Sequence, residues 1–334
     1  MEKSVSIIVP CYNEEKYIEN CLNSILDFDY PLDKLEVFFI DGMSNDLTRE
    51  IILKYSKQHS FIKLIDNPKK TVPFALNKAI KLAKGEIIIR LDAHASYSKN
   101  YIKYLVENLQ KLNAANVGVV WKTDVYNKNK KSLAIKKVLS HPIGVGNAHF
   151  RTGVTQTMEV DTVPFGCWRK ESFEKHGFFN EKLTRNQDIE FNKRIINAGE
   201  KIYLLPNAEC VYYARETFRK ISKNNFQNGM WNILTVFYTK DLTSLSLRHF
   251  VPLFFVLSLF LPLLFALIYW PICIISVFSF ILYLLLIISI SIKLNDKTTS
   301  FFNLVYTFFI LHISYGIGSL TGILKLPFIA IKKD

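Results

Sequence analysis

Charge is missing from a long stretch of this 334-residue chain. No Lys, Arg, Asp or Glu occurs from residue 250 to residue 292. The charged residues after His249 are five lysines and two aspartates, so the preceding part carries about +10 of the net charge of +13. This contrast excludes a uniformly water-soluble chain. It predicts a soluble domain held on a membrane by C-terminal segments.

Cysteine is scarce and scattered. The chain has five cysteines and no C-x-x-C pair, which excludes a cysteine-based metal framework and predicts reduced, structural thiols. The N-terminal segment MEKSVSIIVPCYNEE has an apolar run too short for the core of a signal peptide, and acidic residues follow at once. We therefore expect the soluble domain to stay in the cytoplasm.

Lysine is abundant, but no basic stripe alternates with aromatic residues. This pattern argues against a nucleic-acid partner. A basic domain beside a membrane suits anionic headgroups and anionic ligands. A compositional bias of the genome explains the same excess equally well, so charge alone does not identify the partner.

The first 120 residues alternate short apolar runs with amphipathic patterns. Runs of β-branched residues predict strands at 5–9, 35–40, 62–65, 87–91 and 117–121. Helical periodicity predicts helices at about 14–26, around Ile51 and Ile52, and at 72–83 and 101–112. Such alternation predicts an α/β, Rossmann-like fold with a mostly parallel, doubly wound sheet.

Ligands of parallel sheets bind beyond the carboxyl ends of the strands. The polar residues at those positions are Tyr12, Glu14, Asp41, Asp66, Asp92 and His94. Asp92 and His94 are two residues apart, so both side chains can reach one point. One or two protein ligands with substrate phosphate oxygens suit Mg²⁺, and an imidazole moves the preference towards Mn²⁺. Alternatively, Asp92 caps the next segment and His94 only donates a hydrogen bond to phosphate.

The later part of the soluble domain is less regular. Residues 157–165 are expected to be extended, and a helix is expected from 186 to 198 with Gly199 as its C-cap. Between residues 218 and 237, Phe226, Met230, Ile233 and Phe237 share one helical face. That face fits a helix in the membrane interface and a helix packed on the domain core equally well.

Two apolar segments, 250–270 and 272–292, are long enough to cross a bilayer, with Pro271 at the turn between them. Residues 301–324 form a third segment, in which Gly318 and Gly322 allow close helix packing. Three crossings would place the C-terminal lysines outside, against the positive-inside rule, so the last crossing stays open. The predicted domains are a catalytic domain at 1–217, an interfacial helix and linker at 218–249, and a membrane region at 250–334.

Six segments together identify a resemblance. They are S-I-I-V-P-C-Y-N-E-E, I-D-G-M-S-N-D-L-T, N-K-A-I-K-L-A-K-G-E-I-I-I-R-L-D-A-H-A, V-D-T-V-P-F-G-C-W-R-K-E, R-N-Q-D-I-E-F-N-K-R and S-L-S-L-R-H. In this order they resemble the family 2 glycosyltransferases of GT-A fold. The branch that they resemble is membrane-anchored and typified by succinoglycan-type β-1,3-glucosyltransferases. The resemblance covers almost the whole chain.

The resemblance implies roles for the strand-end residues. Tyr12 and Glu14 would flank the nucleoside, and Asp41 would accept a hydrogen bond from the uracil N–H. Asp92 and His94 would hold the Mn²⁺ or Mg²⁺ ion. Asp46 would touch the nucleotide or cap the helix that carries Thr48. Residues near the phosphates would be Asn77, Lys78 and Arg90, and Lys78 could equally be a solvated helix lysine.

Asp188 is the expected catalytic base, which removes the proton of the acceptor hydroxyl. It lies in a first helical turn, where the helix dipole favours the ionised carboxylate. Glu190 is two positions away and so cannot face the same sugar. A single base with direct displacement would invert the anomeric centre.

Arg215, Gln227 and Trp231 lie where family 2 synthases carry a Q-x-x-R-W-like segment. Arg215 is expected to contact the donor or acceptor. Met230 replaces the arginine of that segment, and this departure weakens the case for a processive synthase. D-A-H also departs from the commoner D-x-D.

The expected function is transfer of one sugar from a UDP-sugar to a lipid-linked, polyprenyl-diphosphate glycan at the inner membrane. Two alternatives are a polyprenyl-phosphate sugar synthase and a non-catalytic subunit that binds nucleotide sugars. A transporter is disfavoured because His312 is the sole ionisable residue of the expected kind in the apolar segments.

Overall fold

A computed structural model describes residues 2–146 and 148–331 of the chain. Its contacts divide the chain into two units. The first unit comprises Met1–Lys122 and His149–Tyr213, and the second comprises Thr123–Ala148 and Ala214–Asp334. Residues 123–148, which the sequence analysis assigns to the catalytic domain, therefore group with the C-terminal helices.

Half of the sheet in the first unit is parallel, as predicted. The strand order is β3-β2-β1-β4, formed by β3 (Ile62–Asp66), β2 (Leu35–Asp41), β1 (Val5–Cys11) and β4 (Ile87–Arg90). Cys11 pairs with Asp41, which pairs with Asp66. This register aligns the strand ends, so the loops that follow them lie along one edge of the sheet.

Helices cover both faces of the sheet because alternate strand residues point to opposite sides. Ile7 of β1 packs in one hydrophobic cluster and Ile8 in another. Core residues of the first cluster come from α1 (Ile18–Leu26), α2 (Thr48–Gln58) and α4 (Tyr101–Lys111). Core residues of the second come from α3 (Val72–Leu82), α8 (Glu171–His176) and α9 (Gln187–Asn197). A short 3₁₀ helix, η1 (Leu32–Lys34), precedes β2.

The other half of the sheet adds antiparallel pairs. The order continues through β8 (Cys167–Arg169), β6 (Asn116–Asp124), β9 (Ile202–Tyr213) and β5 (Ala95–Tyr97), and β7 (Met158–Glu159) pairs with β9. The fifth predicted strand lies within β6. Of the extended segment predicted at 157–165, two residues form a strand.

The chain turns sharply just before β8. Phe165 and Gly166 both have positive φ, 62° and 95°. A Cβ on Gly166 would lie 2.2 Å from the Trp168 ring, so this position requires glycine. A short helix, α7 (His149–Thr152), lies earlier in the same unit.

In the second unit, two helices pack closely through glycines. They are α10 (Phe218–Thr239) and α13 (Phe301–Ile331). A Cβ on Gly229 would lie 1.9 Å from the carbonyl oxygen of Tyr315, and one on Gly318 would lie 2.0 Å from that of Phe226. The predicted close packing at Gly318 thus involves α10. The buried positions of α10 include Asn225, Gly229 and Asn232 besides Met230, so its packed face differs from the apolar face that the sequence indicates.

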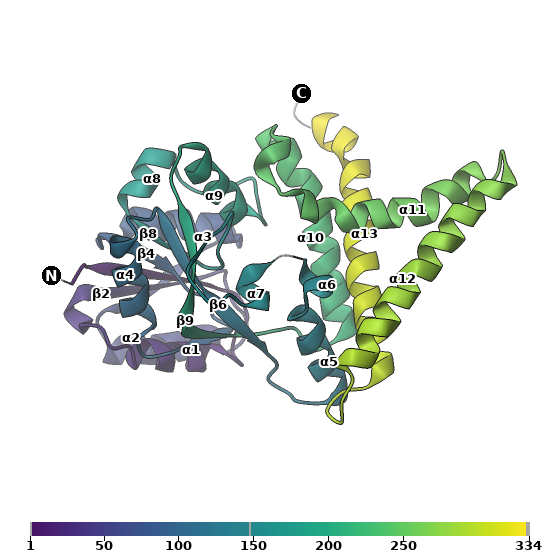
Figure 1. The fold of residues 1–334 in the computed structure, drawn as a ribbon. Coiled ribbons are helices and arrows are strands. Elements are labelled where there is room, and N and C mark those ends of the chain that lie inside the picture. The colour runs from purple at the N-terminus through teal and green to yellow at the C-terminus, as the bar shows by residue number, and fades with distance from the viewer. Residues whose placement is uncertain (1, 147, 332–334) are drawn as a thin grey trace. The chain divides into compact units, whose positions relative to one another are not determined.

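The remaining helices of this unit complete a helical layer (Figure 1). They are α5 (Lys130–Leu139), α6 (Pro142–Val145), α11 (Val251–Phe265), α12 (Cys273–Leu294) and the 3₁₀ turns η2 (Leu242–Ser244), η3 (Leu247–Phe250) and η4 (Trp270–Ile272). Lys137 of α5 pairs with Asp296 at 2.7 Å.

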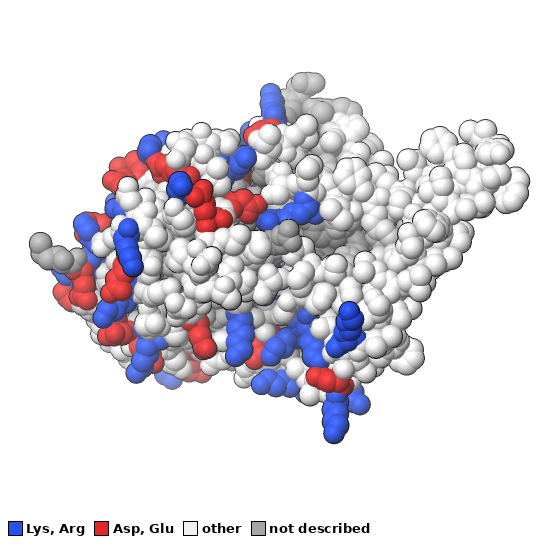
Figure 2. Space-filling view, viewed as in Figure 1, with Lys and Arg blue, Asp and Glu red and all other residues white. Residues whose placement is uncertain are grey.

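Within the described residues, three segments are long and apolar enough to cross a membrane: Leu247–Phe265, Trp270–Leu294 and Phe301–Ile329. The turn predicted around Pro271 is η4. About 11% of each of the first two segments is buried, against 39% of the third, which packs on α10. Figure 2 shows α11 and the adjoining part of α12 as a surface without Lys, Arg, Asp or Glu, whereas Lys293 lies in the last turn of α12. These two helices expose their apolar side chains, as a lipid-facing surface does.

Candidate active site

The loops after β1 and β2 are tied together by hydrogen bonds. The backbone N–H of Asn13 donates to Oγ of Ser44 at 2.8 Å, and that of Glu14 donates to Oγ1 of Thr48 at 2.7 Å. Asn13 has a positive φ of 55°, which asparagine tolerates better than most residues. The N–H groups that follow β1 are therefore oriented by the neighbouring loop.

Asp41, at the end of β2, is fully buried and well bonded. It accepts hydrogen bonds from Nη1 of Arg49 at 2.6 Å and from the backbone N–H of Ser44 at 2.9 Å. The Ser44 hydroxyl donates to its other oxygen. Arg49 also pairs with Asp66 at 2.8 Å, so one guanidinium joins the ends of β2 and β3. The weakest of its contacts is with the Cys11 thiol, whose Sγ lies 4.0 Å from Oδ1.

Asp92, His94 and Glu14 converge after β4 and β1. Nδ1 of His94 lies 3.0 Å from Oε1 of Glu14, and Nε2 lies 4.0 Å from Oδ2 of Asp92. The three side chains are 17–20% exposed. His94 thus stands between two carboxylates, with one nitrogen directed to each.

The surroundings of His94 favour positive charge. Burial by itself lowers the pKa of His94, but Tyr212, Glu14 and Asp92 outweigh it and raise the pKa to about 10. The Tyr212 ring lies 5.1 Å from the imidazole, centroid to centroid. A metal ion and a proton compete for the same nitrogen, so the carboxylates that stabilise one cation there would stabilise the other.

A divalent ion fits this donor set as a two-ligand site. Among the described residues, no group of three or more His, Cys, Asp and Glu side chains is arranged to hold a metal. Two ligands of one ion, each about 2.1 Å from it, lie up to about 4 Å apart, as Asp92 and His94 do. Glu14 would orient the imidazole from its other nitrogen. Substrate oxygens would have to complete the shell.

Arg90 links Asp92 to Asp188. Its Nη2 donates to Oδ1 of Asp92 at 3.0 Å, and its Nη1 lies 3.9 Å from Oδ2 of Asp188. Burial lowers the pKa of Arg90, yet Asp92 and Asp188 more than compensate, so its pKa is raised. Within the described part of the chain, Nε and Nη1 of Arg90 are buried without a hydrogen-bond partner.

Asp188 and Glu190 face different surroundings, as predicted from helical geometry. Asp188 is in the first turn of α9, two residues after the N-cap Asn186 in the left-handed conformation, and its side chain is 28% exposed. Glu190 is buried in a bidentate pair with Arg194, at 2.8 and 3.0 Å. Glu190 is thus held in a structural ion pair, whereas Asp188 reaches the edge where Asp92 lies.

Other candidate residues divide into two groups. Tyr12 is 50% exposed beside Gly42, which leaves its ring open to a ligand. Asp46 accepts from the backbone N–H of Thr48 at 3.0 Å, so its capping role is present. The side-chain amide of Asn77 is already occupied. Its Nδ2 donates to the backbone carbonyl of Phe179, and its Oδ1 accepts from the backbone N–H of the same residue.

Lys78 donates to the backbone carbonyl of Asp66 at 2.8 Å. Arg215 is exposed and lies outside the first unit, two residues beyond its last strand. Gln227 and Trp231 belong to α10 of the second unit. Sequence reasoning missed Arg49 and the linking position of Arg90. The signal available for Arg49 was its position eight residues after Asp41, in a D-x-x-x-x-x-x-x-R spacing.

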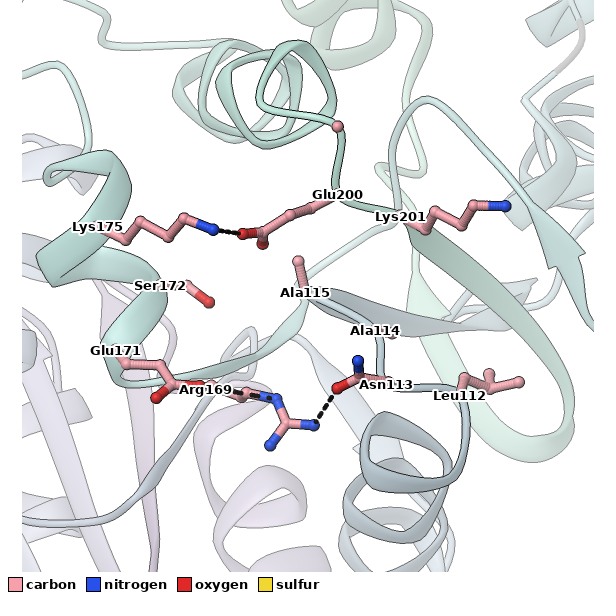
Figure 3. A pocket seen from close by; sticks show the side chains of 11 residues that line it. Leu112, Asn113, Ala114, Ala115, Arg169, Glu171, Ser172, Lys175, Glu200 and Lys201 are labelled. Atoms are coloured by element: carbon pink, nitrogen blue, oxygen red, sulfur yellow. Dashed lines mark hydrogen bonds and ion pairs between the residues drawn. The ribbon is translucent and has the colours of Figure 1, made fainter.

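A cavity of about 630 Å³ lies elsewhere in the first unit (Figure 3). Its lining includes Asn113, Arg169 and Lys175. Arg169 pairs in register with Ile87, the first residue of β4, so the cavity is at the edge opposite the strand ends described above. Its charged groups neutralise one another, as in the Lys175–Glu200 pair. The cavity is separate from the Asp92 site.

The fold and site can be compared with known proteins. The family model "Glycosyl transferase family 2" matches residues 6–177, half of the chain. The chain belongs to glycosyltransferase family 2. This confirms the resemblance inferred from the six sequence segments, and it establishes the chain as a glycosyltransferase.

Two relatives of this family 2 glycosyltransferase are each 30% identical to it. One is the "Dolichyl N-acetyl-alpha-D-glucosaminyl phosphate 3-beta-D-2,3-diacetamido-2,3-dideoxy-beta-D-glucuronosyltransferase" of Methanococcus voltae, aligned over 67% of this chain and 71% of that one. The other is succinoglycan biosynthesis protein ExoA of Rhizobium meliloti, aligned over 63% of each. These relatives associate the chain with polysaccharide or glycan biosynthesis.

Solved structures confirm the GT-A fold. A mannosyltransferase from Pyrobaculum calidifontis, in complex with GDP-Man and Mn²⁺, superposes with a TM-score of 0.58 at 18% identity. The superposition covers 94% of this chain and 87% of that one. Residues 1–349 of S. aureus TarS give a TM-score of 0.53 at 17% identity, over 96% and 91%.

Proposed function

We propose that this family 2 glycosyltransferase moves one sugar from a UDP-sugar to a hydroxyl of a polyprenyl-diphosphate-linked glycan. The product would enter an exopolysaccharide or capsule-type assembly. The observation that carries the proposal is the link from Asp92 through Arg90 to Asp188. An inverting transfer requires a cation at the leaving group and a base at the acceptor, and we assign these tasks to the two ends of this link.

Each residue has a defined task in this reaction. Asp188 would accept the proton of the acceptor hydroxyl as that oxygen attacks the anomeric carbon, and a single displacement inverts the α-linked donor to a β-glycoside. Arg90 would hold Asp188 in position, since its Nη1 lies 3.9 Å from Oδ2 of that carboxylate. Tyr12 would stack its ring on the nucleoside. Glu14 would accept a hydrogen bond from the ribose or from His94, and Asp41 would accept one from the uracil N–H. Arg215 is proposed as a further donor or acceptor contact.

Asp92 and His94 would hold Mn²⁺ or Mg²⁺ as two protein ligands. When bound, such an ion supplies positive charge that offsets the charge developing on the leaving diphosphate. The structural neighbour from P. calidifontis is described with Mn²⁺, which supports this assignment.

The lipid-linked acceptor is supported by the apolar helices and by a relative. The M. voltae enzyme is named for a dolichyl-phosphate-linked sugar. The acceptor here would likewise be a glycosylated carrier, at the inner membrane with the first unit in the cytoplasm. The alternative acceptor, bare polyprenyl phosphate, would make the chain a polyprenyl-phosphate sugar synthase.

We further infer that α11 and α12 insert as a hairpin, whereas α13 lies against α10 at the membrane surface. The loop between α11 and α12 has no charged residue. Arg248 precedes α11, and Lys293 lies in the last turn of α12. Two crossings place these cations, together with Lys325 of α13, on the cytoplasmic side, as the positive-inside rule requires.

The decisive assay follows labelled sugar from a panel of UDP-sugars into extracted membrane lipids, with Mn²⁺ and with EDTA. We expect label in the lipid fraction with metal and wild-type protein, and none with EDTA or with Asp188→Asn. Equal transfer to bare polyprenyl phosphate would instead support the synthase. Equal labelling by wild type and Asp188→Asn would contradict the proposed chemistry.

A further inference from the structure

A half-buried arginine of the first unit lies among aromatic rings, and residues 2–146 and 148–331 give it no ion pair with a carboxylate. The guanidinium carbon of Arg151, in α7, lies 4.4 Å from the ring centroid of Trp121 and 5.5 Å from that of Tyr212. The Phe150 ring is 5.7 Å away. The rings of Trp121 and Tyr212 are stacked at 4.4 Å, 11° from parallel. The cation is therefore held in a rigid aromatic frame.

Two donors of this frame have no acceptor. Nη1 of Arg151 and Nε1 of Trp121 are both buried and lack a hydrogen-bond partner among the residues that the structure describes. Burial lowers the pKa of Arg151, and Tyr212 acts against this through its charge and through a side-chain hydrogen bond to the guanidinium. A desolvated guanidinium with no counter-charge is costly to fold. Such a cost is typical of a site that a ligand neutralises.

The frame adjoins the proposed metal edge on the side away from the nucleoside. Tyr212 contacts the Arg151 guanidinium, and its ring also packs 5.1 Å from His94. Glu14, from the loop after β1, contacts the opposite nitrogen of His94. His94 therefore separates the β1–β2 edge, where Tyr12 and Asp41 lie, from the Arg151 frame on β6 and β9.

We propose that Arg151 and Trp121 bind a phosphate group of the acceptor, the diphosphate that joins glycan to lipid carrier. The inference rests on the proposed function, because it deepens the assignment of a lipid-linked acceptor. A phosphate fits the chemistry: it offers several strong acceptor oxygens to a planar guanidinium and to a neighbouring indole N–H. A neutral sugar hydroxyl would leave the arginine charge without compensation.

Geranyl diphosphate is a suitable probe, with geraniol as its uncharged counterpart. Binding is measured with saturating UDP and Mn²⁺, so that the donor position is already filled. We expect the wild-type protein to bind geranyl diphosphate more tightly than geraniol. Arg151→Met should weaken diphosphate binding about ten- to hundredfold, the usual effect of losing a charge-assisted hydrogen bond at a buried site, and should leave geraniol binding unchanged.

Three variants make the test specific. Arg151→Lys keeps the charge and should bind geranyl diphosphate with an affinity between those of the wild type and Arg151→Met. Trp121→Phe keeps an aromatic ring but removes the indole N–H, so it should weaken diphosphate binding less than Arg151→Met does. The matched control is Arg169→Met, which removes an arginine bonded to Asn113 at the opposite edge of the sheet. It should bind as the wild type does.

Two outcomes would overturn the inference. Equal diphosphate affinity of folded wild type, Arg151→Met and Arg151→Lys would mean that Arg151 serves packing alone. A loss confined to UDP binding would assign the frame to the donor diphosphate. If the wild type transferred no sugar to any acceptor while Arg151-dependent diphosphate binding persisted, the proposed function would fail and the binding site would stand.

Discussion

Arg90 donates a hydrogen bond to Asp92 at 3.0 Å, from the end of the same strand that delivers Asp92 to the edge of the sheet. Its second terminal nitrogen lies 3.9 Å from Asp188, on a helix nearly a hundred residues later. One buried cation thus relates the proposed metal ligand to the proposed base. Neither carboxylate can shift far without losing part of this shared charge.

Replacing Arg90 should disturb both carboxylates at once. We expect Arg90→Met to lower the single-turnover rate of transfer about 100-fold, because small misplacements of reacting groups have effects of that size. Arg90→Lys should recover part of the rate, since an ammonium keeps the charge but cannot bridge both partners. The readout is transfer from UDP-sugar under saturating Mn²⁺. Unchanged rates in both variants would show that Arg90 has no positioning role.

Asp188→Asn should remove the base and leave donor binding intact. General bases contribute about 10²- to 10⁴-fold, so the rate of transfer should fall by that amount while the dissociation constant of UDP stays the same. Glu190→Gln is the matched control on the same helix. Its carboxylate is paired with Arg194, so we expect lower thermal stability and a near-normal rate per folded molecule. The reverse pattern would assign the base to Glu190.

His94→Asp should alter metal preference more than it alters rate. An aspartate supplies an oxygen ligand, and oxygen ligands favour Mg²⁺ where imidazole favours Mn²⁺. We therefore expect the ratio of activity in Mn²⁺ to that in Mg²⁺ to fall. A ratio that stays unchanged in His94→Asp would indicate that His94 contacts phosphate and not metal.

Glu14→Gln should weaken metal binding about 10- to 100-fold, because it removes the partner that orients the His94 ring.

The parallel half of the fold was predictable because its signals are local. The cores of β1, β2 and β4 are apolar runs, and the amphipathic helices between the strands have a clear period, so Asp41 and Asp92 could be placed at strand ends. The strands β5 and β8 have three residues each, too few for any period to be detected. The turn at Phe165 and Gly166 depends on packing against Trp168, which no local pattern reveals.

The site was predictable to the same extent. The residue types that follow the strands indicated Glu14, Asp92 and His94. Which nitrogen of His94 lies near which carboxylate depends on the geometry of the loops. Arg151 lies in a four-residue helix within an irregular region, and its aromatic partners come from β6 and β9. Contacts between elements so distant in sequence are set by the tertiary fold, so the sequence could not indicate them.

The helix pair α10 and α13 should be sensitive to added volume at its glycines. Gly318→Leu would place side-chain atoms against the backbone of α10, where a Cβ alone would lie 2.0 Å from a carbonyl oxygen. We expect the free energy of unfolding to fall by about 3 kcal/mol, the upper end for overpacking. Ile323→Ala changes a side chain that is 41% exposed on the same helix and should have little effect. Thermal unfolding in detergent measures both, and equal stabilities would argue against the close pairing.

The hairpin topology makes a distinct prediction for labelling from outside the cell. Lys297→Cys, beyond α12, and a cysteine appended to the C-terminus should react with a membrane-impermeant maleimide only after the membrane is opened. Tyr269→Cys, in the turn between α11 and α12, should react in intact cells, since two crossings place that turn on the far side. Native Cys273 is replaced by serine, because it lies near the turn and is the one cysteine that is not buried. If α13 crosses the membrane, the C-terminal cysteine reacts in intact cells and Lys297→Cys does not. Because α13 carries Lys325 and packs Gly318 and Gly322 on α10, we expect the C-terminal cysteine to be protected.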